Sequence, residues 1–366
     1  MAPEGSGHDA TMSHHVPAAP ALALLAVLVT SVCAAAQRQP PEPPTAELPA
    51  ALAHFDPYFQ SPGDRTSSHM PRVIIRNIRE DRAGGIWFAT FGGPIRYDGK
   101  TFTSFGPEVG LANTRVFSLT EDRAGAMWFG SITDGASRYD GKTFQKVRTA
   151  EGLGGNDVFW VFEDRDGNVW FGTNKGASRF DGKSITNFDV EDGLLHDSVY
   201  SIAQDATGRI WFGTQGGICS YDGTKFVDLA DKVGRSFVNV RAVAVSKSGD
   251  LWFAGQQGAF RYDGQTLQSF TKEQGLPSDF VGSLCIDRAG KVWMGHPNGH
   301  EGGGVSCYDG KALRHLTSKD GLVSDNVYCV YEDRAGRMWF GTVDAGACWY
   351  DGEKFTSVSL GGAEGK

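Results

Sequence analysis

The sequence predicts an all-β fold, a seven-bladed β-propeller built of four-stranded antiparallel blades. A Trp-Phe pair (Trp-Met once) recurs every 41 or 42 residues, with a last interval of 46, and its Trp is found at Trp87, Trp128, Trp170, Trp211, Trp252, Trp293 and Trp339. An aromatic residue followed by Asp-Gly keeps step with it at Tyr97, Tyr139, Phe180, Tyr221, Tyr262, Tyr308 and Tyr350. Seven copies of about forty residues are typical of propeller blades.

Each copy contains four short β-like runs separated by turn residues. In the second copy these runs are 116–120, 126–130, 136–139 and 143–147. Gly lies three residues before every Trp, and Asp lies six before it in all copies but the fifth, which has Ser246. We expect the Gly to adopt a positive φ and the Asp side chain to bond the turn backbone. Asp-Gly after the aromatic residue predicts a second tight turn.

The first 36 residues are expected to form a signal peptide. An apolar run, Pro20–Ala36, ends in three alanines before Gln37, which is a cleavage context for export. Either Met1 or Met12 is the start of this segment. Cys33 leaves lipoprotein anchoring as an alternative to a soluble mature form, and the mature chain is expected to contain no membrane span.

The rest of the chain divides into three segments. Residues 37–70 form a Pro-rich linker, in which Phe55–Phe59 is interpreted either as a stray outer strand or as a decayed half-repeat. Residues 71–358 form the propeller, and 359–366 form a C-terminal tail. The net charge of −8 argues against nucleic acid or an anionic membrane as a partner. The propeller's cysteines form no C-x-x-C pair, so buried free thiols are expected, with a single bridge between late blades left open.

The two ends of the predicted ring differ in how much they vary. The turn before the Trp strand and the Asp-Gly turn fall at one end, and the aromatic-to-Trp spacing across them is always 31 residues. The Trp-to-aromatic spacing, which crosses the other end, ranges from 10 to 15 residues. The longest interval places an insertion around Gly295–Gly302 of the sixth copy. We call this end the variable face, and we expect any binding site there, since binding groups are usually carried on variable loops.

One position in every copy, eleven residues before the Trp, is predicted to form a ring around the channel. Gly282 occupies it in the sixth copy, and the other six side chains, which we call the channel ring, are Arg76, Phe117, Phe159, Tyr200, Arg241 and Tyr328. This mixture suits an anionic or sugar-like ligand, through stacking and charge-assisted hydrogen bonds. The alternative is that these side chains only pack between blades.

A second group of candidate ligand-binding residues lies in the insertion and consists of His296, His300 and Glu301. Their types could bind a metal or act as acid and base. The surrounding loop is rich in Gly and holds no third His, so a flexible surface loop is the competing interpretation. No catalytic residue, metal ligand or cofactor is assigned from the sequence.

Three motifs recur in fixed order and together resemble the two-component-regulator propeller repeat: Glu332–Thr342, Tyr139–Phe144 and Asp192–Leu194. The resemblance covers about residues 71–358. It implies the propeller fold and an exported ligand-sensing region, which in that family is usually joined to a membrane span and a histidine kinase. Because few residues follow Asp351-Gly352, any kinase is expected to be a separate partner.

Two functions from different classes follow as hypotheses. The preferred one is a non-catalytic exported module, periplasmic or extracellular, that binds a small molecule, glycan or protein on the variable face and feeds a two-component system through its partner. The alternative is a lyase- or hydrolase-like enzyme acting on a peptide or glycan, with a metal-dependent site in the insertion. That alternative draws on a resemblance to propeller lyases of cyclic peptide antibiotics, which use a His and metal-bound carboxylates.

Overall fold

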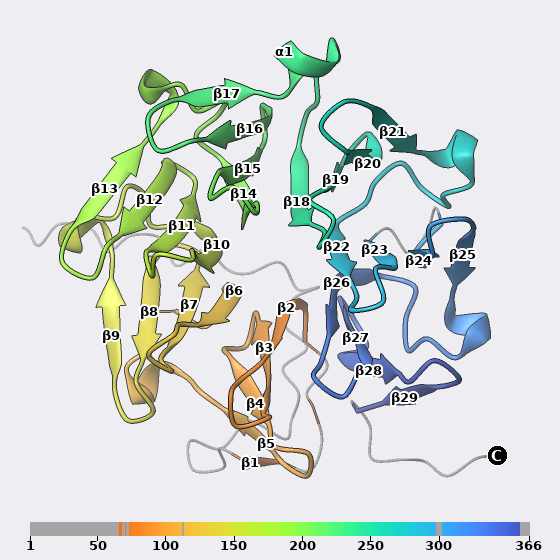
Figure 1. Cartoon of the computed structure of the whole chain (residues 1–366). Helices are drawn as coiled ribbons and strands as arrows, with labels where there is room; N and C mark the ends of the chain where they lie inside the picture. The colour runs from red at the N-terminus through yellow and green to blue at the C-terminus, as the bar shows by residue number, and fades with distance from the viewer. Residues whose placement is uncertain (1–65, 68–69, 71–72, 112, 298–301, 359–366) are drawn as a thin grey trace, which may run out of the picture. The chain divides into compact units, whose positions relative to one another are not determined.

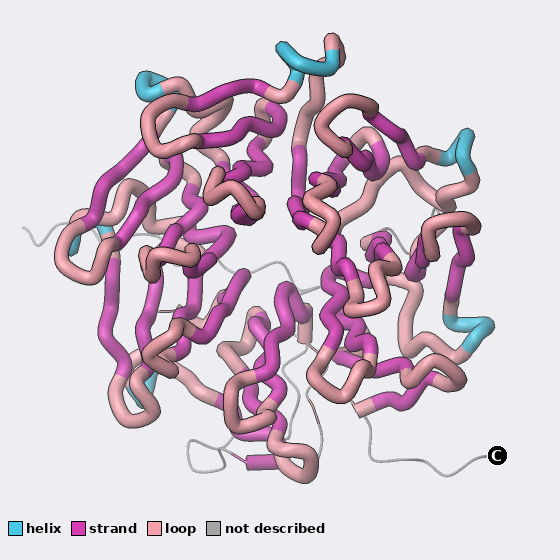
Figure 2. Tube along the Cα trace, in the orientation of Figure 1, coloured by secondary structure: helices cyan, strands magenta, loops and turns pink. Residues whose placement is uncertain are grey.

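Seven antiparallel sheets are arranged in a ring (Figure 1 and Figure 2). The structure is a computed structural model and describes residues 66–67, 70, 73–111, 113–297 and 302–358. The four strands of each repeat follow chain order within their sheet, with the first at the centre of the ring and the fourth toward its outside (Figure 1). The predicted fold class, an all-β propeller with seven four-stranded blades, is confirmed.

The strands of the first four blades agree with the repeat pattern, and in the second blade they start and end within one residue of the predicted runs. Their bounds are β2 Ile75–Glu80, β3 Ile86–Thr90, β4 Ile95–Tyr97 and β5 Phe102–Ser104; β6 Val116–Glu121, β7 Met127–Ser131, β8 Ala136–Tyr139 and β9 Phe144–Val147; β10 Val158–Glu163, β11 Val169–Thr173, β12 Gly176–Phe180 and β13 Ile185–Phe188; β14 Val199–Gln204, β15 Ile210–Thr214, β16 Gly217–Tyr221 and β17 Phe226–Asp228.

The last three blades repeat this plan, and short helices lie in the connections between blades. The strands are β18 Val240–Val245, β19 Leu251–Gly255, β20 Gly258–Tyr262 and β21 Leu267–Phe270; β22 Ser283–Ile286, β23 Val292–His296, β24 Gly304–Tyr308 and β25 Leu313–Leu316; β26 Val327–Glu332, β27 Met338–Thr342, β28 Ala347–Tyr350 and β29 Phe355–Ser357. The helices are the 3-10 turns Pro107–Val109, Thr149–Glu151, Val190–Asp192, Lys272–Gln274 and Ser318–Asp320, and α1 Ala230–Val233.

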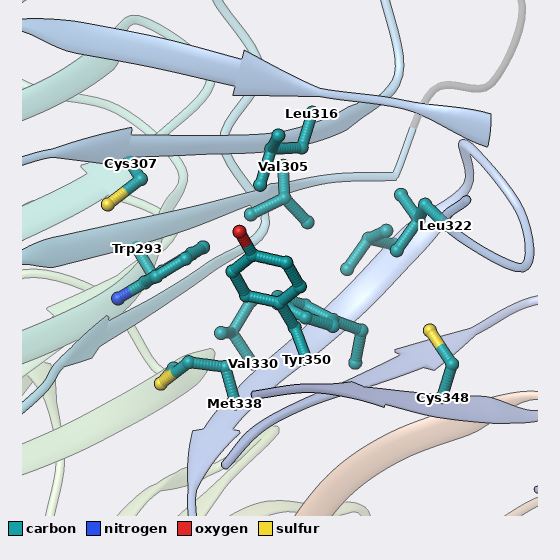
Figure 3. Packing of buried hydrophobic residues seen from close by; sticks show 11 residues of the cluster. Trp293, Val305, Cys307, Leu316, Leu322, Val330, Met338, Cys348 and Tyr350 are labelled. Atoms are coloured by element: carbon teal, nitrogen blue, oxygen red, sulfur yellow. The ribbon is translucent and has the colours of Figure 1, made fainter. Parts of the chain in front are cut away.

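The second strand of every blade is fully buried, and its Trp packs against the next blade. Trp211 of blade four belongs to one cluster with Val240, Val243 and Phe253 of blade five. Figure 3 shows the equivalent cluster between blades six and seven, where Trp293 lies among side chains of the following blade. Burial of these rings between blades gives the molecule one core cluster per joint, which is the packing expected of a closed propeller.

Among the residues that the structure describes, no strand is shared between the first and last blades of the ring. Each blade takes its four strands from one repeat, and Trp339 of blade seven packs in one cluster with Ile75 and Phe88 of blade one. A two-residue strand, β1 (Thr66–Ser67), pairs with β5 on the outer edge of blade one. The predicted stray strand at 55–59 lies outside the described residues.

The Asp side chain of the first turn accepts a hydrogen bond from the turn backbone, as predicted. It also accepts a hydrogen bond from the indole of the repeated Trp. In blade one, Asp81 accepts hydrogen bonds from the backbone N–H of Gly85 and from the indole N–H of Trp87, both at 2.8 Å. Gly84 in this turn has φ +88°, a value that favours Gly because it lacks a Cβ. In the fifth blade, Ser246 replaces the Asp and its hydroxyl accepts from the N–H of Asp250.

Arginines link neighbouring blades at the end of the ring opposite the variable face. The backbone N–H of Arg82 donates to Glu121 of the next blade at 2.8 Å, and its guanidinium donates to the carbonyls of Asp122 and Arg123. Arg334 makes the corresponding bonds to blade one. The other members of this link, which we call the rim arginines, are Arg123, Arg165 and Arg288.

The joint between blades four and five differs from these. Ala206 stands in place of the rim arginine and Val245 in place of its acceptor. A cavity of about 250 Å³ opens at this joint and is lined in part by Trp211 and Val245. The rim link therefore has neither of its side chains here.

Candidate functional site

The channel ring residues are carried on β-bulges. In blade one, Ile75 pairs with Thr90 and Asn77 pairs with Ala89, so Arg76 is an extra residue in the first strand. The same register shift occurs in five further blades, at Phe117, Phe159, Tyr200, Arg241 and Tyr328. A bulge bends its strand and re-aims the extra side chain, which accounts for the inward direction of these six.

The six side chains and Gly282 line one central cavity of about 500 Å³. All six are half-buried, so part of each faces the open space. They lie near the start of the first strands, which is the end of the blades that the variable connections enter. The prediction that they surround the channel on the variable face is therefore confirmed, and ligand binding by them stays a prediction.

The channel ring forms a continuous series of side-chain contacts through six blades, which we call the stack although its Phe–Phe and Phe–Tyr contacts are edge-to-face or tilted. The Arg76 guanidinium lies between the Tyr328 and Phe117 rings, with its carbon 4.3 and 4.4 Å from their centres. Ring centres are 6.0 Å apart from Phe117 to Phe159 and 5.4 Å apart from Phe159 to Tyr200. Arg241 completes the stack over Tyr200. The alternative interpretation, packing between blades, also has support, because every side chain of the channel ring contacts a ring side chain of an adjacent blade.

The two arginines of the channel ring have no carboxylate partner. Neither Arg76 nor Arg241 forms an ion pair with a carboxylate among the described residues. Burial lowers the pKa of the Arg76 guanidinium from its ordinary value, and the positive charge of Arg241 acts in the same direction. Buried charges are normally paired, so two unpaired guanidiniums in one cavity form an attractive place for a negative group.

Blade six interrupts the stack. Its first strand begins after Gly282 and has no bulge, and a Cβ at Gly282 would lie 2.8 Å from the Pro297 side chain. Pro297 follows the Trp strand of the same blade and lines the cavity. The glycine is therefore required by the close approach of the start of the insertion, which replaces a ring side chain in this sector.

His296 is not in a flexible loop, and that part of the sequence interpretation was wrong. It is the last residue of β23 and is completely buried. Its Nε2 lies 2.9 Å from the Ser306 hydroxyl and its Nδ1 lies 3.2 Å from the carbonyl oxygen of Phe280. The hydroxyl of Ser306 in turn lies 3.3 Å from His315 Nδ1. Burial lowers the pKa of His296 to about 4, so the side chain is a neutral structural group at neutral pH.

The remaining insertion residues, His300 and Glu301, lie outside the described residues. Within the described part of the chain, no three His, Cys, Asp or Glu side chains come together as a metal site. The five described cysteines are free thiols: Cys219, Cys285, Cys307, Cys329 and Cys348. Burial raises the pKa of the Cys329 thiol to about 12, which makes it a poor nucleophile.

The sequence analysis did not identify two polar residues that line the cavity, Asn77 and Ser283. Asn77 Oδ1 and Ser283 Oγ are buried without a hydrogen-bond partner among the described residues, and so is Arg241 Nε. The signal that could have located the bulges is the spacing of buried β-branched residues. Val158 and Val161 are both buried, three residues apart, whereas an unbroken strand alternates with a period of two.

A family model described as "Two component regulator propeller" matches five segments of the chain, which are residues 110–133, 152–175, 193–216, 275–298 and 321–344. Each segment runs from a Gly-Leu connection through the first two strands of a blade to the turn that follows. No curated protein matches the sequence.

Several solved structures share the fold. The extracellular domain assigned to the hybrid two component system BT3049 from B. thetaiotaomicron has a TM-score of 0.68 and 24% identity, over 78% of this chain and 40% of that one. The extracellular domain assigned to the one component system BT4673 from B. thetaiotaomicron has a TM-score of 0.64 and 20% identity, over 78% and 40%. A streptogramin B lyase has a TM-score of 0.60 and 12% identity, over 77% and 95%.

These identities establish a common fold alone. The chain spans about two-fifths of the length of the two extracellular domains. No helix in the described part of the chain is long and apolar enough to cross a membrane.

Proposed function

Because the chain carries two-component regulator propeller repeats, we propose that it is an exported, non-catalytic module that binds a small molecule in the mouth of its channel. The binding site is the channel ring on the variable face. Occupancy of this site is passed to a separate signalling protein of a two-component system. The extracellular domains that share the fold support this placement.

The observation that carries the proposal is the set of six bulges. A bulge interrupts strand pairing, and the propeller repeats it in six blades at a position that faces the cavity. A cavity of about 500 Å³ is in the range that holds small molecules. Its wall combines aromatic faces with a few convergent polar groups, as small-molecule sites do.

The structure gives less support to the enzyme hypothesis than the sequence did. It relied on a reactive His296, whose ring is buried and hydrogen-bonded within blade six and does not line the cavity. The lyase among the similar structures supports a common fold and nothing about chemistry in this chain. We therefore keep binding without turnover as the proposal.

A ligand screen of the whole chain tests this function. A panel of sugars, organic acids, amino acids and short peptides is screened by thermal shift, and any positive compound is titrated by calorimetry and incubated to look for products. We expect saturable binding without turnover. Phe159→Ala should weaken it roughly three- to tenfold through lost stacking. Phe226→Ala, a half-buried Phe outside the cavity, serves as control.

Two results would contradict the proposal. Equal affinities for wild type and Phe159→Ala would place the ligand elsewhere on the molecule. Conversion of a bound compound to product would restore the enzyme hypothesis. Export is tested separately, by fusing residues 1–36 to a reporter that is active only outside the cytoplasm.

A further inference from the structure

The charges that line the central cavity do not balance. Among the described lining residues, three arginines face one acid, Glu332. That acid is already engaged, since Glu332 accepts a hydrogen bond from the backbone N–H of Arg288 at 2.8 Å and pairs with its guanidinium at 3.8 Å. Arg79 donates to the carbonyl of Ile78 and stacks on Tyr331. None of the three arginines has a carboxylate counter-ion in the described structure, and two of them, Arg76 and Arg241, belong to the channel ring.

The two arginines of the channel ring belong to one sector of the cavity, and the positive charge of Arg241 helps to lower the pKa of the Arg76 guanidinium. In chain order around the ring, Arg241, Gly282, Tyr328 and Arg76 occupy blades five, six, seven and one. The cavity-lining polar atoms without partners lie in the same sector: Arg241 Nε can only donate, and the Ser283 hydroxyl can donate. Asn77 Oδ1 is an acceptor there and suits a ligand hydroxyl.

The opposite sector is aromatic. Phe117, Phe159 and Tyr200 stand on consecutive bulges of blades two, three and four, and each ring is half-buried. No charged side chain of the channel ring interrupts these three blades. The cavity therefore has a cationic half and an aromatic half, a division that neither packing nor a neutral sugar requires.

We infer that the channel mouth binds a small organic anion, in which an oxyanion lies between Arg76 and Arg241 and a flat apolar ring lies against Phe117, Phe159 and Tyr200. This inference rests on the proposed function and adds the chemical class of the ligand. A guanidinium presents a planar fork of donors that fits a carboxylate, sulfate or phosphate, and its face stays free to stack on an aromatic ring. Both arginines already use that face, on Tyr328, Phe117 and Tyr200.

Matched probes separate the parts of this inference. Benzoate, phenyl sulfate and phenyl phosphate are titrated against the whole chain by calorimetry beside benzamide, which is neutral and of similar shape. We expect at least one of the anions to bind about tenfold more tightly than benzamide, and its affinity to fall as salt rises. Comparison of the three anions then identifies which oxyanion the two guanidiniums prefer.

Variants locate the anion. Arg241→Gln should weaken binding of the preferred anion by about tenfold or more, because a charge-assisted bond is lost. Arg76→Gln should do the same, and a melting curve shows whether that sandwiched variant remains folded. Lys183→Gln removes one positive charge from an exposed turn at the opposite end of the blade and should leave affinity unchanged.

The outcomes separate a failure of the anion inference from a failure of the proposed function. Equal binding of benzamide and the anions, with Arg241→Gln unaffected and Phe159→Ala weakened, would overturn the anion while keeping the channel as a binding site. Binding of none of the probes at millimolar concentration would also overturn the anion, and the wider ligand panel would then decide the proposed function. The anion inference is supported if binding is selective for an anion, falls as salt rises, and is weakened in both arginine variants.

Discussion

The guanidinium carbon of Arg241 lies 3.9 Å from the centre of the Tyr200 ring, so a cation of blade five stacks on an aromatic side chain of blade four. This contact is worth roughly 0.5–2 kcal/mol. Arg241→Ala should therefore lower the free energy of unfolding by no more than about 2 kcal/mol. Ile202→Ala, which empties a buried position in blade four, should lower it by roughly 2–5 kcal/mol. Urea denaturation of both variants compares them, and equal losses would mean that Arg241 is a packing residue.

The repeated Trp should be the main packing residue of each joint. Trp211 is 5% exposed, lies in the cluster between blades four and five, and donates its indole N–H to Asp205 at 2.9 Å. Trp211→Ala should lower the free energy of unfolding by roughly 3–5 kcal/mol. Chemical denaturation measures the change. A loss below about 1 kcal/mol would contradict the joint as described, because the empty space left by the removed indole should by itself cost more than that.

The positive φ of the first-turn glycines allows a matched pair of substitutions. Gly167 has φ +89° and Gly208 has φ +94°. A Cβ at Gly167 would lie 3.3 Å from the Arg123 guanidinium, whereas no atom lies within 4 Å of one at Gly208. Gly208→Val should cost roughly 1–3 kcal/mol through backbone strain alone. Gly167→Val should cost more, because it also displaces a rim arginine. Thermal melts test the order, and an unchanged Tm for both would contradict the turn geometry.

The buried His296 makes stability depend on pH. Its pKa falls from 6.5 to about 4 on folding, so the native state holds the neutral ring. The resulting stability is present above pH 6.5 and is lost as pH falls toward 4, since the unfolded chain binds the proton first. The total effect is roughly 3 kcal/mol.

The control for this pH dependence comes from the other blades. The position of His296 is Thr in blades one, three, four and seven, where the hydroxyl donates to the carbonyl of a turn Gly. His296→Thr should therefore fold, and its melting temperature should fall less than that of wild type between pH 7 and pH 5. Parallel pH curves for the two proteins would show that His296 is already protonated or exposed.

The missing rim link offers a gain of stability. Ala206→Arg with Val245→Glu should restore the link between blades four and five and raise the free energy of unfolding by about 0.5–1.5 kcal/mol. The acid is needed because Arg209 and Lys232 already line this joint. Val245→Glu alone is the control. A double variant no more stable than that control would show that the arginine does not dock there.

The repeat allowed nearly all of the fold to be predicted, because Trp and aromatic-Asp-Gly recur at fixed distances. The bulges were missed because the strands were assigned from the repeat spacing and the turn residues, which do not show how two strands pair. His296 was placed in a loop because of the long Trp-to-aromatic interval of the sixth copy. The length of that interval shows that residues were inserted, but it does not show at which residue the strand ends. Its position, three residues after the Trp, is Thr in four other copies, so comparison between copies could have corrected it. Its bonds to Ser306 and its link to His315 join three strands, and no local pattern predicts them.

The bulges also bear on how such a protein changes over generations. Val199 and Ser201 keep their pairs with Thr214 and Gly213 whatever side chain stands at Tyr200 between them. Substitution at a bulged position therefore alters the channel wall while leaving the pairing of the strand intact. Six such positions, each in a separate repeat, can drift independently of the core that holds the blades together. A lineage with this architecture can acquire new ligand preferences by single mutations, and the same six codons are the natural targets for a randomised library.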